Sequence, residues 1–271
     1  MVIFAFQILE PMATANDRIK REQEFHNQIF NDKSRKVTDK FYSIFSLIEQ
    51  RYVALLTHQA KGRKILEYGC GEGSSAYLIA QNGGQVTGID ISDYAIKQAR
   101  SKAEKMNLPI TFKQMNAEAL EFENQSFDLV CGSGIIHHLD IEKSYREISR
   151  VLSPGGKAVF MEPLGHNPLI NWYRSRTPHL RTEDEHPLLQ PDLKALNRYF
   201  GKVKLSYYFL CSLTAIFFRN AFIFKPLLKC LHGIDCCIFT VFPFMRKQAW
   251  FVLIEASEPI NTVNQPLNKI F

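Results

Sequence analysis

Two carboxylates and three glycines lie close together in residues 64–90, in a pattern that suits the binding of a nucleoside. Glu67 ends one short apolar run and Asp90 ends another, with a helical stretch between them. The glycines after the first run occupy alternate positions, Gly69, Gly71 and Gly73. Glycines let a backbone approach a ligand closely, and a carboxylate at the tip of the next strand can accept hydrogen bonds from ribose hydroxyls. The stretch predicts a strand, a tight glycine turn, a helix and a second strand.

The spacing of the glycines separates two kinds of nucleotide site. A dinucleotide fingerprint, G-x-G-x-x-G, would need glycine at position 74, where the sequence has Ser74. The pattern E-x-G-x-G-x-G instead resembles the first motif of class I S-adenosylmethionine-dependent methyltransferases. In that family the glycine loop holds the methionine part of the cofactor, and the acid after the second strand holds its ribose. The resemblance implies S-adenosyl-L-methionine as the cofactor; a glycine-rich turn in another α/β domain is the alternative.

The resemblance also implies which other residues contact the cofactor. Asn116 follows the third predicted strand, where the family normally has an acidic or amide residue that reaches the adenine amino group. Asn116 could equally cap a helix. Tyr42 is expected to fold over the cofactor as a lid, unless its helix only caps the sheet edge. The predicted cofactor-binding residues are Glu67, Gly69, Cys70, Gly71, Gly73, Asp90, Ile91, Asn116, Ala117, Glu118, Ser133 and Tyr42.

Histidines and a carboxylate after the fourth and fifth predicted strands are the candidates for a general base. His137 and His138 follow the run FDLVCGSGII, Glu162 ends the strand KAVFME, and His166 comes four residues later. Imidazole and carboxylate groups can take the proton from an oxygen or nitrogen acceptor. Either histidine could instead orient a loop. The predicted catalytic residues are His138, Glu162, His166 and His137.

Residues 162–189 combine many titratable side chains with several prolines. In the resembled family the segment after the fifth strand builds the acceptor pocket, which implies the same role here. His166, Glu183 and His186 have the side-chain types of metal ligands, yet no metal-ligand spacing supports them. The six cysteines form no C-x-x-C pair. We therefore predict no metal.

Alternating strands and helices predict an α/β fold with a doubly wound parallel sheet. The resemblance implies a Rossmann-like sheet of seven strands, mostly parallel, in which the seventh strand is antiparallel and inserts beside the fifth. A helical cap precedes the sheet, and a hydrophobic helical insertion separates strands six and seven. The predicted divisions are a cap at 1–60, a methyltransferase domain at 61–257 with an acceptor-pocket segment at 162–200 and an insertion at 210–247, and a flexible tail at 258–271.

Composition limits the classes of partner. The chain has 271 residues, 46% of them hydrophobic, which suits one α/β domain with additions. Its net charge of +6 comes from scattered basic residues, so we expect no nucleic-acid partner. Cys70 and Cys131 fall at predicted interior positions, which favours reduced thiols and the cytoplasm. The apolar N-terminus lacks the positive start of a secretory signal.

The insertion at 210–247 is rich in Phe, Leu and Ile, with basic residues along it. The longest uncharged run, residues 205–218, is shorter than the roughly 20 residues that span a bilayer. An interfacial helical hairpin on the inner face of a membrane fits this composition. The alternatives are a lid on the catalytic domain or a contact between subunits of an oligomer.

Together these features predict an S-adenosylmethionine-dependent methyltransferase similar to ubiquinone- and sterol-type enzymes. Its acceptor is expected to be small and apolar or lipid-like, methylated on oxygen or carbon rather than nitrogen. The enzyme would act mainly by aligning the acceptor with the sulfonium. The alternative from another class is a non-catalytic scaffold or membrane-associated assembly protein, against which the intact Glu67, Gly69, Gly71 and Asp90 argue. A further alternative is an enzyme that uses the cofactor for other chemistry.

Overall fold

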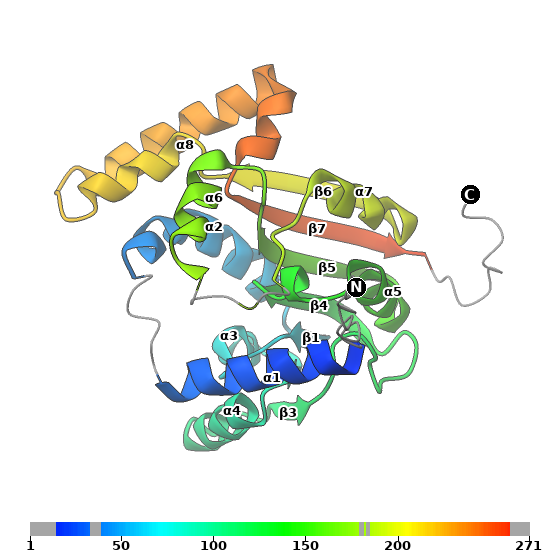
Figure 1. Ribbon diagram of the computed structural model, residues 1–271. Helices are drawn as coiled ribbons and strands as arrows, with labels where there is room; N and C mark the ends of the chain where they lie inside the picture. The colour runs from blue at the N-terminus through cyan, green and yellow to red at the C-terminus, as the bar shows by residue number, and fades with distance from the viewer. Residues whose placement is uncertain (1–14, 33–38, 179–181, 183–184, 261–271) are drawn as a thin grey trace, which may run out of the picture.

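A seven-stranded sheet forms the centre of the computed structural model, which describes residues 15–32, 39–178, 182 and 185–260 (Figure 1). The strand order is β3-β2-β1-β4-β5-β7-β6. The strands are β1 (Lys64–Tyr68), β2 (Gln85–Asp90), β3 (Thr111–Gln114), β4 (Phe127–Ser133), β5 (Leu152–Pro163), β6 (Phe200–Tyr208) and β7 (Phe251–Pro259). Only β7 runs antiparallel to its neighbours, β5 and β6. The predicted fold class is confirmed.

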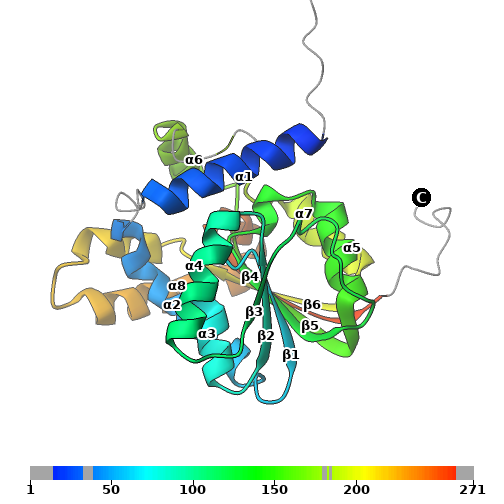
Figure 2. The ribbon, with the colours of Figure 1, turned by 90° about the horizontal axis from the view of Figure 1, so that it is seen from below.

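Helices cover both faces of the sheet, which explains why its strands are apolar rather than alternating. One face carries α2 (Asp39–Thr57), α3 (Ser74–Gln81) and α4 (Asp93–Lys105), and the other carries α5 (Ile141–Val151) and α7 (Gln190–Ala195), as Figure 2 shows. Three further short helices are η2 (Ile136–His138), α6 (Pro168–Ser175) and η4 (Leu196–Arg198).

Local sequence signals set where the helices beside the site begin. Ser92 accepts a hydrogen bond from the N–H of Ala95 at the start of α4. Asp140 accepts one from Lys143 at the start of α5. These caps satisfy N–H groups that the first turn of a helix leaves without a partner. Both helices therefore begin directly after the loops that carry candidate site residues.

The fifth strand is longer than the predicted strand KAVFME. β5 begins directly after α5, at Leu152, and so includes Ser153, Pro154, Gly155 and Gly156. Leu152 pairs with Phe127 and Lys157 pairs with Leu129, so the four residues form a bulge against β4. Gly155, with φ of 79°, supplies the left-handed backbone that this bulge requires.

The predicted N-terminal cap consists of two helices with different neighbours. Ile44 and Ile48 of α2 are fully buried in the core on one face of the sheet. In contrast, α1 (Ala15–Asp32) lies across the loops at the carboxyl ends of the strands (Figures 1 and 2). Helix α1 therefore lies at the open edge of the sheet, whereas α2 is part of the core.

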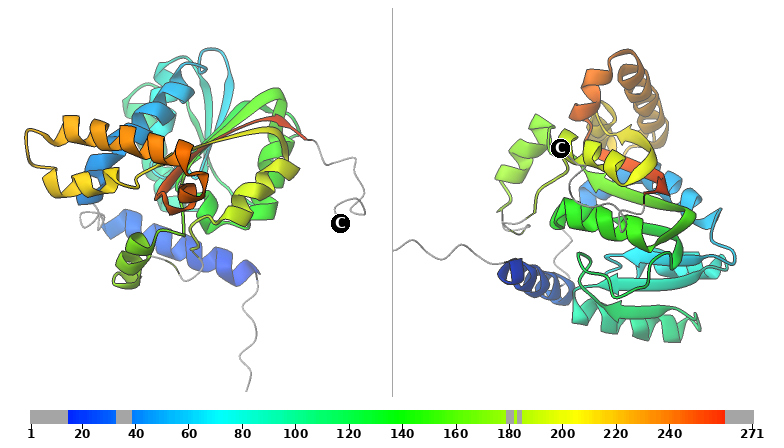
Figure 3. Two further views of the ribbon diagram at one scale, coloured as in Figure 1. Left: turned by 90° about the horizontal axis from the view of Figure 1, so that it is seen from above. Right: turned by 90° about the vertical axis from the view of Figure 1, so that its right-hand side faces the viewer.

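The segment between β6 and β7 contains η5 (Ser212–Phe218), α8 (Phe224–Val241) and η6 (Pro243–Gln248), which lie beside the sheet (Figure 3). Asp235 of α8 is fully buried and accepts hydrogen bonds from the Cys211 N–H at 2.6 Å and from Ser212. The carboxylate thus fastens α8 to η5. No helix in the described part of the chain is long and apolar enough to cross a membrane.

The predicted domain boundaries stay predictions. Strand β7 includes Glu258 and Pro259, so the first residues assigned to the tail are in the sheet. Residues 261–271 and 1–14 lie outside the described residues.

Candidate functional site

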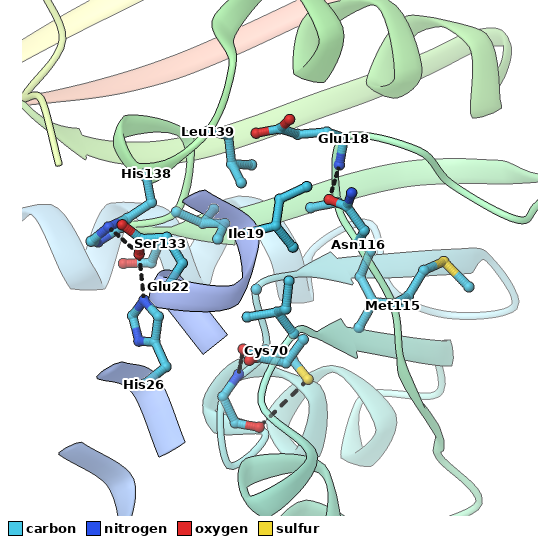
Figure 4. Close-up of a pocket in the computed structure, with 18 of the residues that line it drawn as sticks. Ile19, Glu22, His26, Cys70, Met115, Asn116, Glu118, Ser133, His138 and Leu139 are labelled. Carbon is cyan, nitrogen blue, oxygen red and sulfur yellow. Dashed lines mark hydrogen bonds and ion pairs between the residues drawn. The ribbon is translucent and has the colours of Figure 1, made fainter. Parts of the chain in front are cut away.

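A cavity of about 490 Å³ opens at the carboxyl ends of β1, β2 and β4, beneath α1 (Figure 4). Its size is that of a site for a small molecule or cofactor. Ten of the predicted site residues line it: Gly69, Cys70, Gly71, Asp90, Ile91, Asn116, Ala117, Glu118, Ser133 and His138. Because parallel strands place their carboxyl ends at one edge, residues distant in sequence meet here.

The glycine loop passes close to the loop that follows β4. Gly69 has φ of 66°, and a side-chain Cβ there would lie 2.6 Å from Cγ1 of Ile135. Asp90 holds the loop, because its Oδ2 accepts the Gly71 N–H at 2.8 Å while its Oδ1 accepts the Ser92 N–H at 2.9 Å. A carboxylate has about four lone-pair sites, so Asp90 retains capacity for ribose hydroxyls.

Glu67 and Gly73 were predicted to contact the cofactor but lie behind the loop, outside the lining of the cavity. The carboxylate of Glu67 accepts the N–H groups of Ser75 and Ala76 at the start of α3, at 3.0 and 2.9 Å. Burial raises the pKa of Glu67 to about 7. Gly73 adopts φ of 84° before α3, where a Cβ would lie 2.7 Å from the Tyr77 hydroxyl. Both residues shape the loop that lines the cavity.

The loop after β3 forms another side of the cavity. Asn116 Oδ1 accepts the Glu118 N–H at 2.9 Å within a turn, and no helix begins here, so Asn116 is not the helix cap that was its alternative interpretation. Glu118 is buried, accepts the Asp140 N–H at 2.8 Å, and forms an ion pair with Arg18 of α1. These contacts make Glu118 a junction between the adenine side of the predicted site and α1.

The loop after β4 is held by the buried carboxylate of Glu162. Its Oε1 accepts the N–H groups of Ile135 and Ile136, each at 3.0 Å, and its Oε2 bonds His137 Nδ1 at 2.8 Å. Burial raises the pKa of Glu162 to about 7 and lowers that of His137 well below its usual value. Neither residue lines the cavity, so the Glu162–His137 pair positions the loop that presents His138.

His138 is the predicted catalytic residue that faces the cavity (Figure 4). Its Nδ1 lies 3.3 Å from Oε2 of Glu22, and its carbonyl accepts a hydrogen bond from Arg18 at 3.0 Å. Four residues of α1 line this side: Arg18, Ile19, Glu22 and His26. Sequence reasoning missed all four. The available signal was the spacing of Glu22 and His26, which puts them on one face of a helix.

The segment after β5 reaches the site only in part. His166 Nε2 accepts the Gln190 N–H at 3.2 Å near α7, away from the cavity lining. Glu185 pairs with Arg174 at 2.8 Å and lies 3.9 Å from His137 Nε2. Thr182 donates a hydrogen bond to Glu22 of α1. Glu183 and the side chain of Tyr42 lie outside the described residues.

The region that contains most of the cavity-lining loops is similar in sequence to known proteins. Residues 66–160 match the family model described as a methyltransferase domain. An S-adenosyl-L-methionine-dependent Diels-Alderase of Talaromyces variabilis is 34% identical over 141 residues, covering 50% of this chain and 44% of the relative. A ubiquinone biosynthesis O-methyltransferase of Alkalilimnicola ehrlichii is 34% identical over 119 residues, covering 43% and 48%. The chain thus spans about half the length of the curated relatives it matches.

Solved structures share the fold. Phospholethanolamine N-methyltransferase 2 of Haemonchus contortus, solved with S-adenosylhomocysteine, has a TM-score of 0.58 at 19% identity, covering 85% of this chain and 59% of that one. Geranyl diphosphate methyltransferase, solved with sinefungin, has a TM-score of 0.55 at 18% identity, covering 78% of each chain. At this identity the structures show the fold alone. The predicted resemblance to methyltransferases is confirmed by the sequence matches.

Proposed function

We propose that this protein, whose residues 66–160 form a class I S-adenosylmethionine-dependent methyltransferase domain, transfers the methyl group of S-adenosyl-L-methionine to a small molecule. The observation that carries the proposal is the Gly69–Gly71 loop fastened to Asp90 at the mouth of the cavity. A loop without side chains and an adjacent carboxylate suit the amino-acid and ribose parts of this cofactor.

The cofactor would lie along the sheet side of the cavity. Its methionine part would contact Gly69 and Gly71, and its ribose hydroxyls would donate to Asp90. The adenine ring would lie beside Ile91 and Ala117, which supply apolar surface near the Asn116 amide. This arrangement leaves the sulfonium toward the loop after β4, where His138 lines the cavity.

The acceptor would enter between that loop and α1. Its attacking atom supplies an electron pair to the methyl carbon, and the carbon–sulfur bond breaks with its pair retained by sulfur, giving S-adenosylhomocysteine. A hydroxyl acceptor also loses its proton, and His138 is the group placed to receive it. Most of the rate would come from holding the two reactants in line. Glu162 acts through the loop as a positioning residue.

The acceptor class is proposed to be small and apolar, methylated on oxygen or carbon. Apolar side chains on this side of the cavity support it: Ile19, Ile135 and Leu139. They would contact hydrocarbon, while His138 would contact the reacting polar group.

Peripheral membrane association of a cytoplasmic protein is proposed from the segment between β6 and β7. Large aromatic side chains there are exposed, with Phe222 at 97%, Phe217 at 81% and Phe244 at 65%. Five basic residues accompany them, Arg219, Lys225, Lys229, Arg246 and Lys247. Its acid Asp235 is fully buried, so positive charge dominates the surface. Apolar burial and attraction to anionic head groups would act together.

Flotation with vesicles containing anionic lipid tests the membrane proposal. The full chain should float at low salt, and Phe217→Ser with Phe222→Ser should remain in the soluble fraction. Trp172→Ser, an exposed aromatic change on α6, is the control. A soluble wild-type chain would favour a lid or subunit contact instead.

A second candidate function is cyclisation of a bound substrate with the cofactor retained. The similarity to a Diels-Alderase that depends on S-adenosyl-L-methionine favours it. In this case the cofactor would shape the cavity and its methyl group would stay in place.

Incubation with cofactor labelled on its methyl group distinguishes these functions. Label should move to an apolar small molecule that copurifies, and S-adenosylhomocysteine should accumulate in equal amount. Conversion of a substrate without label transfer would support cyclisation. If the wild-type chain binds neither S-adenosylmethionine nor S-adenosylhomocysteine in calorimetry, both functions are excluded and a scaffold role is favoured.

A further inference from the structure

Three side chains that can bind a metal meet at the α1 side of the cavity. Glu22 and His26 lie one turn apart on α1, and His138 lies in the loop after β4 (Figure 4). One carboxylate oxygen of Glu22, one ring nitrogen of His26 and one of His138 all lie within 4.8 Å of one another. All three residues line the cavity.

Distances within the cluster are too long for good hydrogen bonds. Glu22 Oε2 lies 3.4 Å from His26 Nε2 and 3.3 Å from His138 Nδ1, whereas N–H···O bonds are typically about 2.7–3.2 Å. Glu22 Oε2 and His138 Nδ1 are buried, and neither has a hydrogen-bond partner among the described residues. Their contacts are long ion pairs, which recover only part of the free energy that burial of polar atoms costs, so this placement requires an explanation.

A tetrahedral metal ion supplies that explanation. Ligand atoms about 2.0–2.2 Å from a zinc ion are separated from one another by about 3.3–3.5 Å. The two distances from Glu22 Oε2 match this separation. Two imidazoles and a carboxylate are also a ligand set that suits zinc.

We propose that Glu22, His26 and His138 bind one divalent metal ion of the zinc type, with a fourth coordination position open to the cavity. Thr182 supports the assignment, because its hydroxyl donates to the other oxygen of Glu22, Oε1. Bonds of this kind orient a ligand carboxylate and strengthen a metal site.

A neighbouring set, His137, His138 and Glu185, is less suited to the ion. Glu185 already pairs with Arg174 at 2.8 Å, which neutralises its charge. The distance from His137 Nε2 to Glu185 Oε1 is 3.9 Å, longer than the separation expected around a tetrahedral ion. The ion is therefore assigned to the set that contains Glu22.

The proposed role of the ion in catalysis rests on the proposed methyl transfer. The metal site itself is inferred only from the positions of its three ligands. The fourth position would take the oxygen of a hydroxyl-bearing acceptor. A metal-bound hydroxyl loses its proton to water more readily, because the ion stabilises the resulting oxygen anion. In this arrangement His138 would hold the ion instead of taking the proton. Because two ligands come from α1, metal binding would also hold this helix over the cavity.

Titration of the full chain with zinc chloride tests the site, with S-adenosylhomocysteine titrated separately. We expect one zinc ion per chain. Glu22→Gln and His26→Ala should each weaken zinc binding by at least about 100-fold, and Thr182→Val by about 10–100-fold. The matched controls are Glu24→Gln, on the exposed face of the same helix, and His58→Ala, an exposed histidine of the described chain. Both should bind zinc as the wild type does.

Cobalt(II) provides a second measurement. Bound cobalt should give the intense visible absorption of a tetrahedral site. The His26→Ala variant should lack this absorption, although its far-ultraviolet circular dichroism should match that of the wild type. Absence of stoichiometric zinc binding, or binding that is unchanged in both ligand variants, overturns the site. If zinc binds and S-adenosylhomocysteine does not, the proposed methyl transfer fails and the metal site stands.

Discussion

The two sides of the cavity are built in different ways. On the sheet side, Asp90 holds the glycine loop through the backbone N–H of Gly71, a residue 19 positions earlier. On the α1 side, side chains of the helix contact residues far along the chain. Asn27 bonds Ser92 and Asp93, and Arg18 pairs with Glu118, 100 positions away.

This difference suggests that the sheet side binds the cofactor, whereas α1 controls how ligands reach the cavity. Backbone groups held by carboxylates keep the sheet side preformed, which favours tight binding of a cofactor. Side-chain contacts along a single helix can break without disturbing the core. We therefore expect α1 to open as a unit when ligands enter and leave, as loops over active sites do.

Gly69→Ala should have the largest effect, because it damages the sheet side directly. The new Cβ would lie 2.6 Å from Ile135 Cγ1 on a backbone with φ of 66°. Calorimetry should detect no S-adenosylhomocysteine binding. Gly155→Ala is the matched control, since its φ is also positive, at 79°, but nothing lies within 4 Å of the added Cβ. The control should lose about 1 kcal/mol of stability and keep its affinity. Equal losses of affinity in the two variants would contradict the proposed contact.

Asp90→Ala should weaken cofactor binding by about 100-fold. The change removes the proposed ribose acceptor and the bond to Gly71, and hydrogen bonds to charged groups contribute about 1.5–3 kcal/mol each. Asp93→Ala is the comparison on the α1 side, because Asp93 bonds Asn27 and not the glycine loop. Its effect should be under 5-fold by calorimetry. If a folded Asp90→Ala chain bound the cofactor with wild-type affinity, Asp90 would not be the residue that binds the ribose.

Two buried carboxylates should respond differently to pH. Burial raises the pKa of Glu67 from 4.5 to about 7, so its protonated form favours folding below pH 4.5 and this stabilisation is lost as pH rises through 7. Glu162 has a similarly raised pKa, but the lowered pKa of His137 has the opposite effect on stability below pH 6.5. The folded Glu162–His137 pair therefore binds about as many protons as the unfolded pair over pH 4.5–6.5.

Urea unfolding between pH 4.5 and 7 measures both. Glu67→Gln should flatten the fall of stability with pH by about 2 kcal/mol. Glu162→Gln leaves His137 alone, so stability should rise with pH relative to the wild type. Glu24→Gln, a surface change, is the control. If Glu67→Gln altered the pH dependence of the unfolding free energy no more than this control does, the raised pKa of Glu67 would be refuted.

Arg18→Ala should have the smallest effect of the four, since it removes only a contact of α1. The ion pair with Glu118 and the bond to the His138 carbonyl would be lost, which weakens the hold of α1 on the loops beneath it. Stopped-flow dissociation of S-adenosylhomocysteine should become about five-fold faster. Lys20→Ala, at an exposed position of the same helix, should leave the rate unchanged. An unchanged rate in Arg18→Ala would argue against α1 as the cover.

The sheet side was predictable because its features are local. The glycine spacing, the acid after the second strand and the alternation of strands and helices all appear within short stretches, and the carboxyl ends of parallel strands must meet. The errors were also local. Glu67 and Gly73 belong to the right motif, but the start of α3 uses the carboxylate of one and the backbone of the other. His166 likewise has a structural contact, because its Nε2 accepts the Gln190 N–H at the start of α7.

The sequence by itself therefore determined the fold, the cofactor loop and the position of Asp90, since each follows from chain geometry within a few residues. Only the tertiary structure decided that α1 closes the cavity, that Glu22 and His26 meet His138, and that Glu162 holds the loop in front of it. These contacts join residues separated by 25 to more than 100 positions. Such pairs depend on how a whole helix packs, and the periodicity of that helix says which residues share a face but not which surface the face meets.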